Sequence, residues 1–505
     1  MQYEIPEEVK KICTKLNEAG FEAHIIGGCV RDLIMAQTPK DWDVTTNATP
    51  EQIQKLFPDS FYENEFGTVG VKTESENPSL VVVEVTTYRA ETGYSDKRRP
   101  DEVIFVKTLE EDLKRRDFTM NAVAIKMSND LPAQAGELRM SNGVFIDPFG
   151  GQEDIKNKII RAVGEPEERF GEDALRMMRA VRFVAQLPAS PDGGPFRIEE
   201  KTLEAIRSLS KNLKHISSER IRDELVKIIN GDYADQGIEL LHETGLMKYV
   251  IHELLEGYGV GQNLHHIYTV WEHNVRALKY TVEKKYGFAV RLGSLLHDVG
   301  KPRSKRGDGY NSTFYGHEVI GARMTAKIME RLKFPQDIAD KITKLVRYHL
   351  FYYFPDEVTE SSVRRLVANI GKENVEDLLK VREADRIGSG TPKAVPYKLR
   401  HLKFMIDKVA RDPISPKMLK INGTDVMKLL GIEPSPRVGW IINALMEEVL
   451  EDPKKNTKEY LEKRTHELSG LSELELRELA QKGKMKTAEL EEEAIGKIKE
   501  KHYVK

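Results

Sequence analysis

The sequence predicts an α+β protein, in which a small mixed β-sheet with its helices occupies residues 1–150 and an elongated, all-helical remainder follows. Two observations support this class. Short runs rich in Val, Ile and Thr, which are typical of strands, dominate the first 150 residues. From Gly151 onward the pattern is almost wholly helical. With 505 residues the chain is too long for one hydrophobic core, so several domains are expected.

The elements can be placed in order along the chain. EEVKKICTKLNEAG, residues 7–20, predicts a helix that ends at a glycine. Strands are expected over 23–28, 42–46, 68–73, 79–89 and 101–106. Glycine-rich breaks then divide the chain. The predicted domains are a head (1–150), a helical neck (151–256), a third domain (257–395), a helical tail (396–468) and a charged extension (469–505) that is either a peripheral helix or a partly ordered tail.

Composition narrows the class of protein. Charged residues make up 31% and hydrophobic residues 40% of the chain, which is typical of a soluble globular protein. The two cysteines, Cys13 and Cys29, cannot form a disulfide scaffold and favour a reducing cytosol. The chain opens without a signal pattern, and no run approaches the ~20 apolar residues of a membrane span. A cytoplasmic protein without a membrane partner is therefore expected.

Charge is balanced overall but not locally. A formal net charge of −3 does not indicate a nucleic-acid-binding protein. The stretch 393–420 is nevertheless basic, with two Asp residues among eight Lys and Arg residues. Such a stretch is either the solvated face of a helix or a nucleic-acid contact. The basic residues are Lys393, Lys398, Arg400, Lys403, Lys408, Arg411, Lys417 and Lys420.

Two carboxylates stand one residue apart in the predicted head. Side chains alternate along a strand, so Asp41 and Asp43 are expected on one face and Trp42 on the other. Adjacent carboxylates repel each other unless a cation lies between them, and their oxygens suit a divalent ion. The pattern therefore predicts a metal site. A surface turn with two solvated Asp residues is the alternative.

Glycines and an arginine precede these carboxylates. Gly27 and Gly28 allow the backbone to approach a phosphate, and the helix expected after them presents its N-terminus, to which Arg31 adds a bidentate donor. A triphosphate held beside the metal is therefore predicted. A two-metal site needs a third carboxylate, and Glu84 is the candidate because an unpaired charge within the apolar run VVVEVTTYR would be costly. An ion pair between Glu84 and an arginine is the alternative.

These residues resemble the head signature of the class II tRNA nucleotidyltransferase and bacterial poly(A) polymerase family. Further family motifs follow in order: EEDLKRRDFTMNAVA (110–124), DPFGGQEDI (147–155), GEDALRMMRAVRF (171–183) and SERIRDEL (218–225). The resemblance implies a nucleotidyltransferase head with Mg²⁺ at the catalytic residues Asp41, Asp43 and Glu84. It also implies nucleotide contacts from Gly28, Arg31 and Arg116, with Asp117 and Asn121 shaping the local fold.

The motif at 171–183 can also be interpreted physically. On a helix, Asp173, Arg176, Arg179 and Arg182 form a drifting polar stripe. An Asp acceptor and an Arg donor can pair with a base edge as another base would. Pairing of the Asp with the Arg along the helix is the alternative. The resemblance implies that Asp173 and Arg176 select C or A, while Arg179 and Arg182 hold phosphate or stack.

Two segments bear on the kind of nucleotide addition. YRAETGYSDKRRPDEV, residues 88–103, resembles the full-length flexible loop of CCA-adding and A-adding members, which is shortened in members that add only CC. Asp96, Arg98, Arg99 and Pro100 are all present, so a CC-only enzyme is not expected. Residues 419–461 resemble the body and tail of bacterial CCA-adding enzymes, which favours tRNA contact for the basic stretch at 393–420.

A second constellation lies in the predicted third domain and resembles the ligand set of the HD phosphohydrolase superfamily. The set consists of His273, His297, Asp298 and Asp385, accompanied by Lys301. Imidazole and carboxylate ligands suit Ni²⁺, Mn²⁺ or another divalent metal. His317 and His349 are candidates for a second metal, with Asp298 as the bridge. Structural histidines are the alternative.

The expected activity is template-independent addition of C, C and A to the 3′ end of tRNA from CTP and ATP, with phosphohydrolysis as an additional activity of the HD domain. Paired carboxylates favour transfer, since a binding module does not need them. The alternatives are an A-adding tRNA nucleotidyltransferase, a poly(A) polymerase, and an HD phosphohydrolase with an RNA-binding head. A monomer or homodimer is expected.

Overall fold

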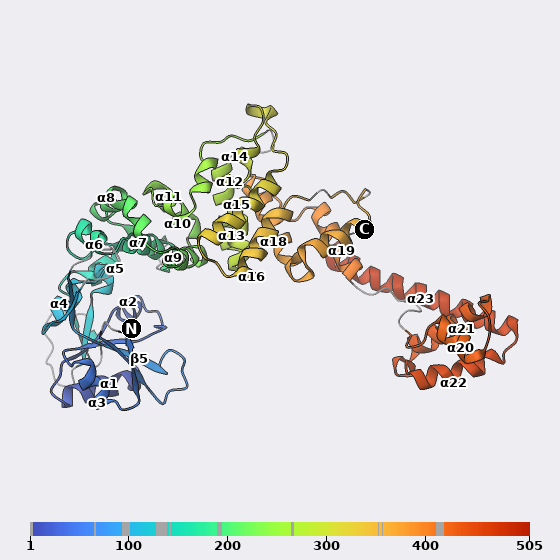
Figure 1. The fold of residues 1–505 in the computed structure, drawn as a ribbon, viewed down its shortest axis with the longest axis horizontal. Coiled ribbons are helices and arrows are strands. Elements are labelled where there is room, and N and C mark those ends of the chain that lie inside the picture. The colour runs from blue at the N-terminus through green and yellow to red at the C-terminus, as the bar shows by residue number, and fades with distance from the viewer. Residues whose placement is uncertain are drawn as a thin grey trace. The chain divides into compact units, whose positions relative to one another are not determined.

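The computed structural model describes residues 4–64, 67–92, 102–127, 139–140, 143–188, 194–263, 267–351, 353–355, 357–410 and 419–504. The chain forms two compact units, the first of residues 1–350 and 376–392 and the second of 351–375 and 393–505. Among the described residues, all strands belong to the first unit, and the strands of the large sheet alternate with helices in the first part of the chain (Figure 1). The predicted α+β class is confirmed, whereas the five domain boundaries stay predictions.

The head is built on an eight-stranded mixed sheet with the order β3-β4-β5-β2-β1-β8-β10-β9. Strands β2 and β5 pair in parallel and the other neighbours pair antiparallel. The bounds are β1 Ala23–Ile26, β2 Asp43–Thr46, β3 Ser60–Asn64, β4 Thr68–Lys72, β5 Val82–Thr87, β8 Ala124–Met127, β9 Arg139–Met140 and β10 Gly143–Ile146. A separate antiparallel pair consists of β6 Arg89–Thr92 and β7 Glu102–Phe105.

The five expected strands are present, although the run over 79–89 divides between β5 and β6. The sequence does not predict β3, β8, β9 and β10, because strands of five residues or fewer with polar members show no clear alternation. A further parallel pair, β11 Ile159–Ile160 and β12 Arg197–Ile198, interrupts the segment expected to be helical.

Helices close the core of the head. α1 Glu7–Glu18 confirms the expected first helix and buries Val9, Ile12 and Leu16. Trp42 lies in the same core, which anchors the segment that carries the two Asp residues. The other head helices are α2 Gly28–Ile34, α3 Pro50–Leu56, α4 Leu109–Lys114, η1 Thr119–Asn121 and α5 Gly151–Lys156.

The helices of the neck and of the segment after it share one core, which extends from Phe118 to Val346. The first group is α6 Pro166–Glu172, α7 Leu175–Gln186, α8 Glu200–Leu209, η2 Ser210–His215, α9 Ser218–Asn230, α10 Ala234–Glu243, α11 Met247–Val250 and η3 His252–Gly257. The second group is α12 Val270–Glu283, α13 Phe288–Leu296, α14 Lys301–Ser304, η4 Gly309–Asn311, α15 His317–Arg331, α16 Gln336–Tyr348 and α18 Val375–Gly388.

Every regular element among the described residues of the second unit is a helix. Its elements are α17 Glu360–Ile370, η5 Lys372–Asn374, α19 Tyr397–Ala410, α20 Gly423–Leu430, α21 Pro436–Glu451, η7 Pro453–Lys455, α22 Lys458–Ser469 and α23 Glu473–His502. α23 begins with a capping box between Ser472 and Glu475 and buries Leu476 and Ala480. The charged end of the chain is therefore a helix that contributes to the core of this unit.

Candidate functional sites

Asp43 and Glu84 are register partners in the head sheet. Asp43 opens β2 and lies opposite Ile26 of β1 and Glu84 of β5. Because register partners on neighbouring strands project to the same face, the two carboxylates share one side of the sheet. The residue expected as the third carboxylate thus lies beside Asp43.

Asp41 precedes the strand but keeps the expected alternation. Asp41 is exposed, Trp42 is buried and Asp43 is half-buried. Among the described residues, Asp41, Asp43 and Glu84 are not a group whose ligand atoms all lie within 4.8 Å of one another. So loose a set fits Mg²⁺, which keeps several waters and is bound through one or two carboxylates together with substrate phosphates.

Gly27 allows Arg116 and Asp43 to meet at the start of α2. Its φ is +83°, and a Cβ there would lie 3.1 Å from Asp43 Oδ2 and 3.0 Å from Arg116 Nη1. Only glycine tolerates both the backbone angle and this crowding. Burial lowers the pKa of Arg116, although the Asp112 carboxylate acts in the opposite direction. The arginine expected to contact nucleotide therefore lies beside a metal-binding carboxylate candidate.

A cavity of about 470 Å³ joins residues of the head to residues of the neck. Six arginines and four carboxylates line it, and this excess of positive charge favours an anion. They are Asp43, Glu84, Arg89, Arg115, Arg116, Asp117, Asp173, Arg176, Arg179 and Arg220. The structure thus brings Asp43 and Glu84, but not Asp41, into one site with Asp173, Arg176 and Arg179 of the motif at 171–183.

The side chains of Asp173 and Arg176 each form hydrogen bonds with other residues of the protein. Asp173, which follows α6, accepts a hydrogen bond at Oδ2 from Arg220 Nη2 at 2.7 Å. Arg176 donates from Nη1 to Glu172 at 2.5 Å and from Nη2 to the Arg115 carbonyl oxygen at 3.1 Å. Both side chains therefore line the cavity near the start of α7, and their hydrogen-bond partners hold each of them in place.

Arg179 links the neck to the head, whereas Arg182 packs within the neck. The Nη2 atom of Arg179 lies 2.6 Å from Oδ2 of Asp117, whose Oδ1 accepts from Asn121 at 3.0 Å. Arg182 donates to Glu224 of α9 at 3.1 Å and is buried outside the cavity lining. A nucleotide contact by Arg182 stays a prediction.

Gly28 and Arg31 also lie outside the cavity lining. Gly28 begins α2, and Arg31 pairs with Asp32 at 2.6 Å and donates to Asn121 Oδ1 at 3.0 Å. Their phosphate contacts stay predictions. The loop residues Asp96, Arg98, Arg99 and Pro100 lie outside the described residues.

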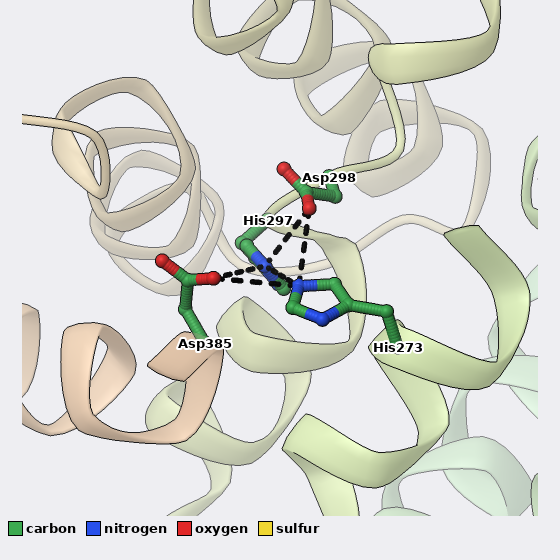
Figure 2. Close-up of side chains that lie close together, drawn as sticks. All are labelled: His273, His297, Asp298 and Asp385. Carbon is green, nitrogen blue, oxygen red and sulfur yellow. Dashed lines mark hydrogen bonds and ion pairs between the residues drawn. The ribbon is translucent and has the colours of Figure 1, made fainter. Parts of the chain in front are cut away.

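Four buried residues meet in a second site (Figure 2), here named the first ligand group: His273, His297, Asp298 and Asp385. His273 comes from α12, His297 and Asp298 directly follow α13, and Asp385 lies on α18. The Nε2 atom of His273 lies 2.8 Å from His297 Nε2, 3.1 Å from Asp298 Oδ2 and 3.4 Å from Asp385 Oδ1. Three segments of the chain thus bring these four side chains together.

Asp298 also belongs to the second ligand group, together with His317 and His349. Its Oδ1 atom lies 3.2 Å from His317 Nε2 and 3.5 Å from His349 Nε2. Gly300 makes this approach sterically feasible, because a Cβ there would lie 2.2 Å from the His317 carbonyl oxygen. Both predicted metal sets are therefore assembled, with the carboxylate of Asp298 common to them.

Ionised carboxylates dominate the electrostatics of the ligand groups. Burial alone would raise the pKa of Asp298, but His297 and Lys301 hold it well below its usual value. Arg382 does the same for the pKa of Asp385. Burial disfavours a charged His297, yet Asp298 and Asp385 raise its pKa to about 10. The two carboxylates are therefore ionised in the folded protein, and carboxylate oxygens beside imidazole nitrogens are donors that suit a divalent cation.

A cavity of about 720 Å³ opens on these groups. His317 and Asp385 line it, one from each ligand group, and Lys301, Arg382 and Arg386 add positive charge. Lys301 Nζ lies 2.5 Å from Asp298 Oδ2 and donates to Gln262 at 2.6 Å. A small anionic ligand suits this volume and charge.

Sequence reasoning missed five arginines that line these cavities: Arg89, Arg115 and Arg220 in the first, and Arg382 and Arg386 in the second. Arg382 lies three residues before Asp385 on α18 and pairs with it at 2.5 Å, a helical spacing that could have revealed it. Arg220 stands 47 residues after its partner Asp173, too far for any local signal.

The basic stretch lies in the second unit, where six of its eight residues are described. Aromatic side chains accompany them on α19 and near it: Lys398 Nζ is 3.2 Å from the centroid of the Phe354 ring, and Tyr397 is 42% exposed. Lys408 instead pairs with Glu360 at 2.8 Å. Aromatic side chains thus accompany the basic ones, so this stretch is more than the solvated charged face of a helix. Arg411 and Lys417 lie outside the described residues.

The fold and the first cavity together define the class of protein: a polymerase-type nucleotidyltransferase head joined to a helical segment. Family models agree along the chain. The model described as the poly(A) polymerase head domain matches residues 23–161, the one described as a probable RNA- and SrmB-binding site of polymerase A matches 195–257, and the one described as putative tRNA nucleotidyltransferase domain 2 matches 320–464. These three matches follow one another along the chain and agree with the resemblance to class II tRNA nucleotidyltransferases and bacterial poly(A) polymerases that the sequence predicts.

Several similar proteins are named CCA-adding enzymes. CCA-adding enzymes of Lactobacillus helveticus and Geobacillus thermodenitrificans are 47% and 44% identical over 236 and 240 residues, which cover 46% and 47% of this chain. The chain spans about half the length of these curated relatives, 53% of each. The crystal structure of the Bacillus stearothermophilus CCA-adding enzyme in complex with CTP has a TM-score of 0.54 at 27% identity, covering 92% of this chain and 98% of the other.

Within the described part of the chain, no helix combines the length and the apolar character needed to cross a bilayer.

Proposed function

We propose that this protein adds C, C and A to the 3′ end of tRNA from CTP and ATP, without a nucleic-acid template. The observation that carries the proposal is the cavity shared by Asp43 and Glu84 of the sheet and Asp173 and Arg176 of the neck. Catalytic carboxylates and base-reading side chains then meet around one nucleotide. The similarity to CCA-adding enzymes supports this choice among the activities of the family.

In the proposed reaction, Asp41, Asp43 and Glu84 hold Mg²⁺ beside the triphosphate. Bound Mg²⁺ would activate the RNA 3′-hydroxyl and neutralise charge on the phosphates. Arg116, next to Asp43, would bind phosphate oxygens and orient the α-phosphorus for in-line attack. The half-buried position of Asp43 keeps this carboxylate accessible to substrate.

Base selection would follow from the donor and acceptor pattern of Asp173 and Arg176. C and A both present an amino donor beside a ring-nitrogen acceptor, whereas U and G present a carbonyl acceptor beside a ring N–H donor. A carboxylate that accepts and a guanidinium that donates therefore complement C and A. Arg220 would act as a positioning residue by holding the Asp173 carboxylate in place.

The second unit would contact the tRNA body. Lysines of α19 supply charge for the phosphate backbone, and neighbouring aromatic rings supply stacking surfaces. We place this activity in the cytoplasm, since Cys13 and Cys29 are buried free thiols, as a reducing compartment permits. A monomer or homodimer stays a prediction.

The test is a product ladder on tRNA that lacks its 3′ CCA, with each NTP alone and with CTP and ATP together. Sequential addition of C, C and A is the expected result. Addition of A only to tRNA that already ends in CC would identify an A-adding enzyme, and long A-ladders would identify a poly(A) polymerase. No nucleotide addition to any of these RNAs would contradict the proposal.

We propose a second activity, the metal-dependent hydrolysis of a phosphoester at the first ligand group. The observation that favours it is the convergence of His273, His297, Asp298 and Asp385 beside a cationic cavity of about 720 Å³. Ni²⁺ or Mn²⁺ suits this donor set. Assays with 2′,3′-cyclic and 2′-phosphate nucleotides, before and after chelation, test it. Hydrolysis that is unaffected by chelation, or none with added metal, would contradict it.

A further inference from the structure

We infer that the exposed ring of Phe61 is a stacking surface for the base of the RNA's 3′-terminal nucleotide, and that it thereby positions the attacking 3′-hydroxyl beside Asp43 and Glu84. The inference rests on the proposed nucleotidyl transfer and adds to it a binding residue for the RNA end. Phe61 lies on β3, at one edge of the eight-stranded head sheet.

A row of register partners leads from the candidate carboxylates of the head to this ring. Asp43 of β2 lies opposite Glu84 of β5. Glu84 lies in turn opposite Gly70 of β4, which lies opposite Phe61. Register partners project to one face of a sheet. Val69, the neighbour of Gly70, is buried in the core on the other face, whereas Glu84 is exposed. Phe61 therefore shares the open face with the carboxylates.

Gly70 allows the ring of Phe61 to lie over the neighbouring strand. A Cβ at Gly70 would be 2.5 Å from Cζ of Phe61 and 2.9 Å from both of its Cε atoms, so the tip of the ring takes the place of a side chain on β4. Neighbouring strands are ~4.8 Å apart, so the ring reaches to about one strand spacing from Glu84. Phe61 is nevertheless 40% exposed. An aromatic surface beside the carboxylates is thus open to a ligand.

The head cavity extends from an arginine on one side of the carboxylates toward this ring on the other. Thr68 of β4 and Thr86 of β5 line the cavity, with their hydroxyl oxygens 3.3 Å apart. Arg116 instead approaches Asp43 at Gly27, which follows β1. In the strand order, β4 and β1 flank the β5–β2 pair on opposite sides. A triphosphate bound at Arg116 therefore leaves the β4 side to the attacking group.

The chemistry of transfer indicates what binds on the β4 side. In-line transfer places the attacking and leaving oxygens on opposite sides of the α-phosphorus. The RNA 3′-oxygen forms the new bond to phosphorus as the bond to pyrophosphate breaks, and its proton passes to solvent. Single-stranded RNA ends are bound by stacking of bases on aromatic rings, a contact that tolerates every base. An end whose last base changes with each addition needs such a contact.

The first experiment combines a change in the ring with a change in the RNA. Phe61→Leu keeps an apolar side chain and removes the aromatic face. Tyr62→Leu is the matched control, because Tyr62 is 46% exposed on the same strand but pairs with Val69, outside the row. Single-turnover rates are measured with the NTP that the product ladder shows to be added, on RNA with an intact or an abasic 3′-terminal nucleotide. Circular dichroism checks that each variant is folded.

The expected result is non-additive loss. Phe61→Leu on intact RNA and wild type on abasic RNA should each be slower by about 10-fold, within the range of one base–aromatic stack. The two changes together should cost no more than either alone, since they remove one shared contact. KM for the NTP should stay unchanged, and Tyr62→Leu should behave as wild type on both RNAs. A wild-type rate in Phe61→Leu, or losses that multiply, would overturn the inference.

Cross-linking tests the contact without turnover. tRNA that lacks CCA and carries iodouracil as its 3′-terminal base is irradiated in complex with the protein, and mass spectrometry identifies the linked residue. A cross-link at Phe61 that Phe61→Leu abolishes and Tyr62→Leu preserves is expected. This cross-link without nucleotide addition would uphold the RNA-end site and contradict only the proposed function. Nucleotide addition without the cross-link, and with losses that multiply, would do the reverse.

Discussion

The two candidate sites of the first unit differ in how completely the protein assembles them. In the ligand groups, buried histidines and carboxylates already bring their ligand atoms within 4.8 Å of one another. In the head, Asp41 is exposed, Asp43 is half-buried, and these carboxylates form no such group among the described residues. One site gathers its candidate ligands into compact groups, whereas the carboxylates of the other form no such group among the described residues.

This difference follows from the chemistry proposed for each. A resident ion needs ligands that neutralise it before substrate arrives, and buried imidazoles held by carbonyls provide them. A nucleotidyl-transfer site must release a metal-bound product and accept a new triphosphate at each addition, so several of its metal ligands belong to substrate. Head variants should therefore affect turnover, while variants of the ligand groups should affect metal content and stability.

The largest expected effect comes from the head carboxylates. Asp43→Ala should reduce nucleotide addition on the order of 10³-fold, about 4 kcal/mol of transition-state stabilisation, because the metal and the triphosphate lose their shared anchor. Asp41→Ala should act in the same direction. Single-turnover rates on tRNA lacking CCA measure the loss.

Binding and a matched control complete this test. tRNA affinity should remain nearly unchanged in both variants, since the basic stretch lies in the second unit. Asp59→Ala removes an exposed head carboxylate that lies 3.7 Å from Lys72, and it should retain the full rate. Substantial turnover in Asp43→Ala would remove this residue from the catalytic site.

Metal removal tests the site formed by the two ligand groups. At a Mn²⁺ concentration 100 times its dissociation constant, ion binding should stabilise the folded state by about 2.7 kcal/mol, which raises the melting temperature by roughly 5 °C. The His297→Ala, Asp298→Ala double variant should lose this shift and spare nucleotide addition. Calorimetry with and without chelator measures the shift. A Mn²⁺-dependent shift that persists in the double variant would place the stabilising ion elsewhere.

The comparison also shows what the sequence can predict. His297-Asp298 and Asp41-Trp42-Asp43 are local pairs, so spacing reveals them. Glu84 can be predicted because a charged residue stands in an apolar strand. The register places it on the same face of the sheet as Asp43. Arg220 depends on how α9 packs on α7, which no spacing encodes. The sequence does not predict short strands such as β9, because two residues show no periodicity.

Base selection gives a smaller effect that sharpens the role of the head cavity. Asp173→Ala should weaken discrimination of CTP and ATP from UTP by about 1–3 kcal/mol, the usual value of one bidentate base contact. Arg220→Gln should shift discrimination in the same direction by less, because it removes the positioning partner and not the acceptor. Misincorporation ratios measured with each NTP alone report both. Wild-type fidelity in Asp173→Ala would mean that another residue reads the base.

The smallest effect concerns Asp117, which ties the head to the neck through Arg179. Burial alone would raise the pKa of Asp117, but Arg179 and Asn121 hold it well below its usual value. Because the folded-state pKa lies below the unfolded value of about 3.9, the pair stabilises the protein above that pH and loses its contribution as the pH falls. Arg179 is 33% exposed, so solvent screens the pair to about 1–2 kcal/mol. The unfolding free energy of Asp117→Asn should thus fall short of wild type by a constant amount above about pH 5, with the gap closing below about pH 4. Urea titrations across this range measure the gap, and one that is independent of pH would show that the ion pair is not its source.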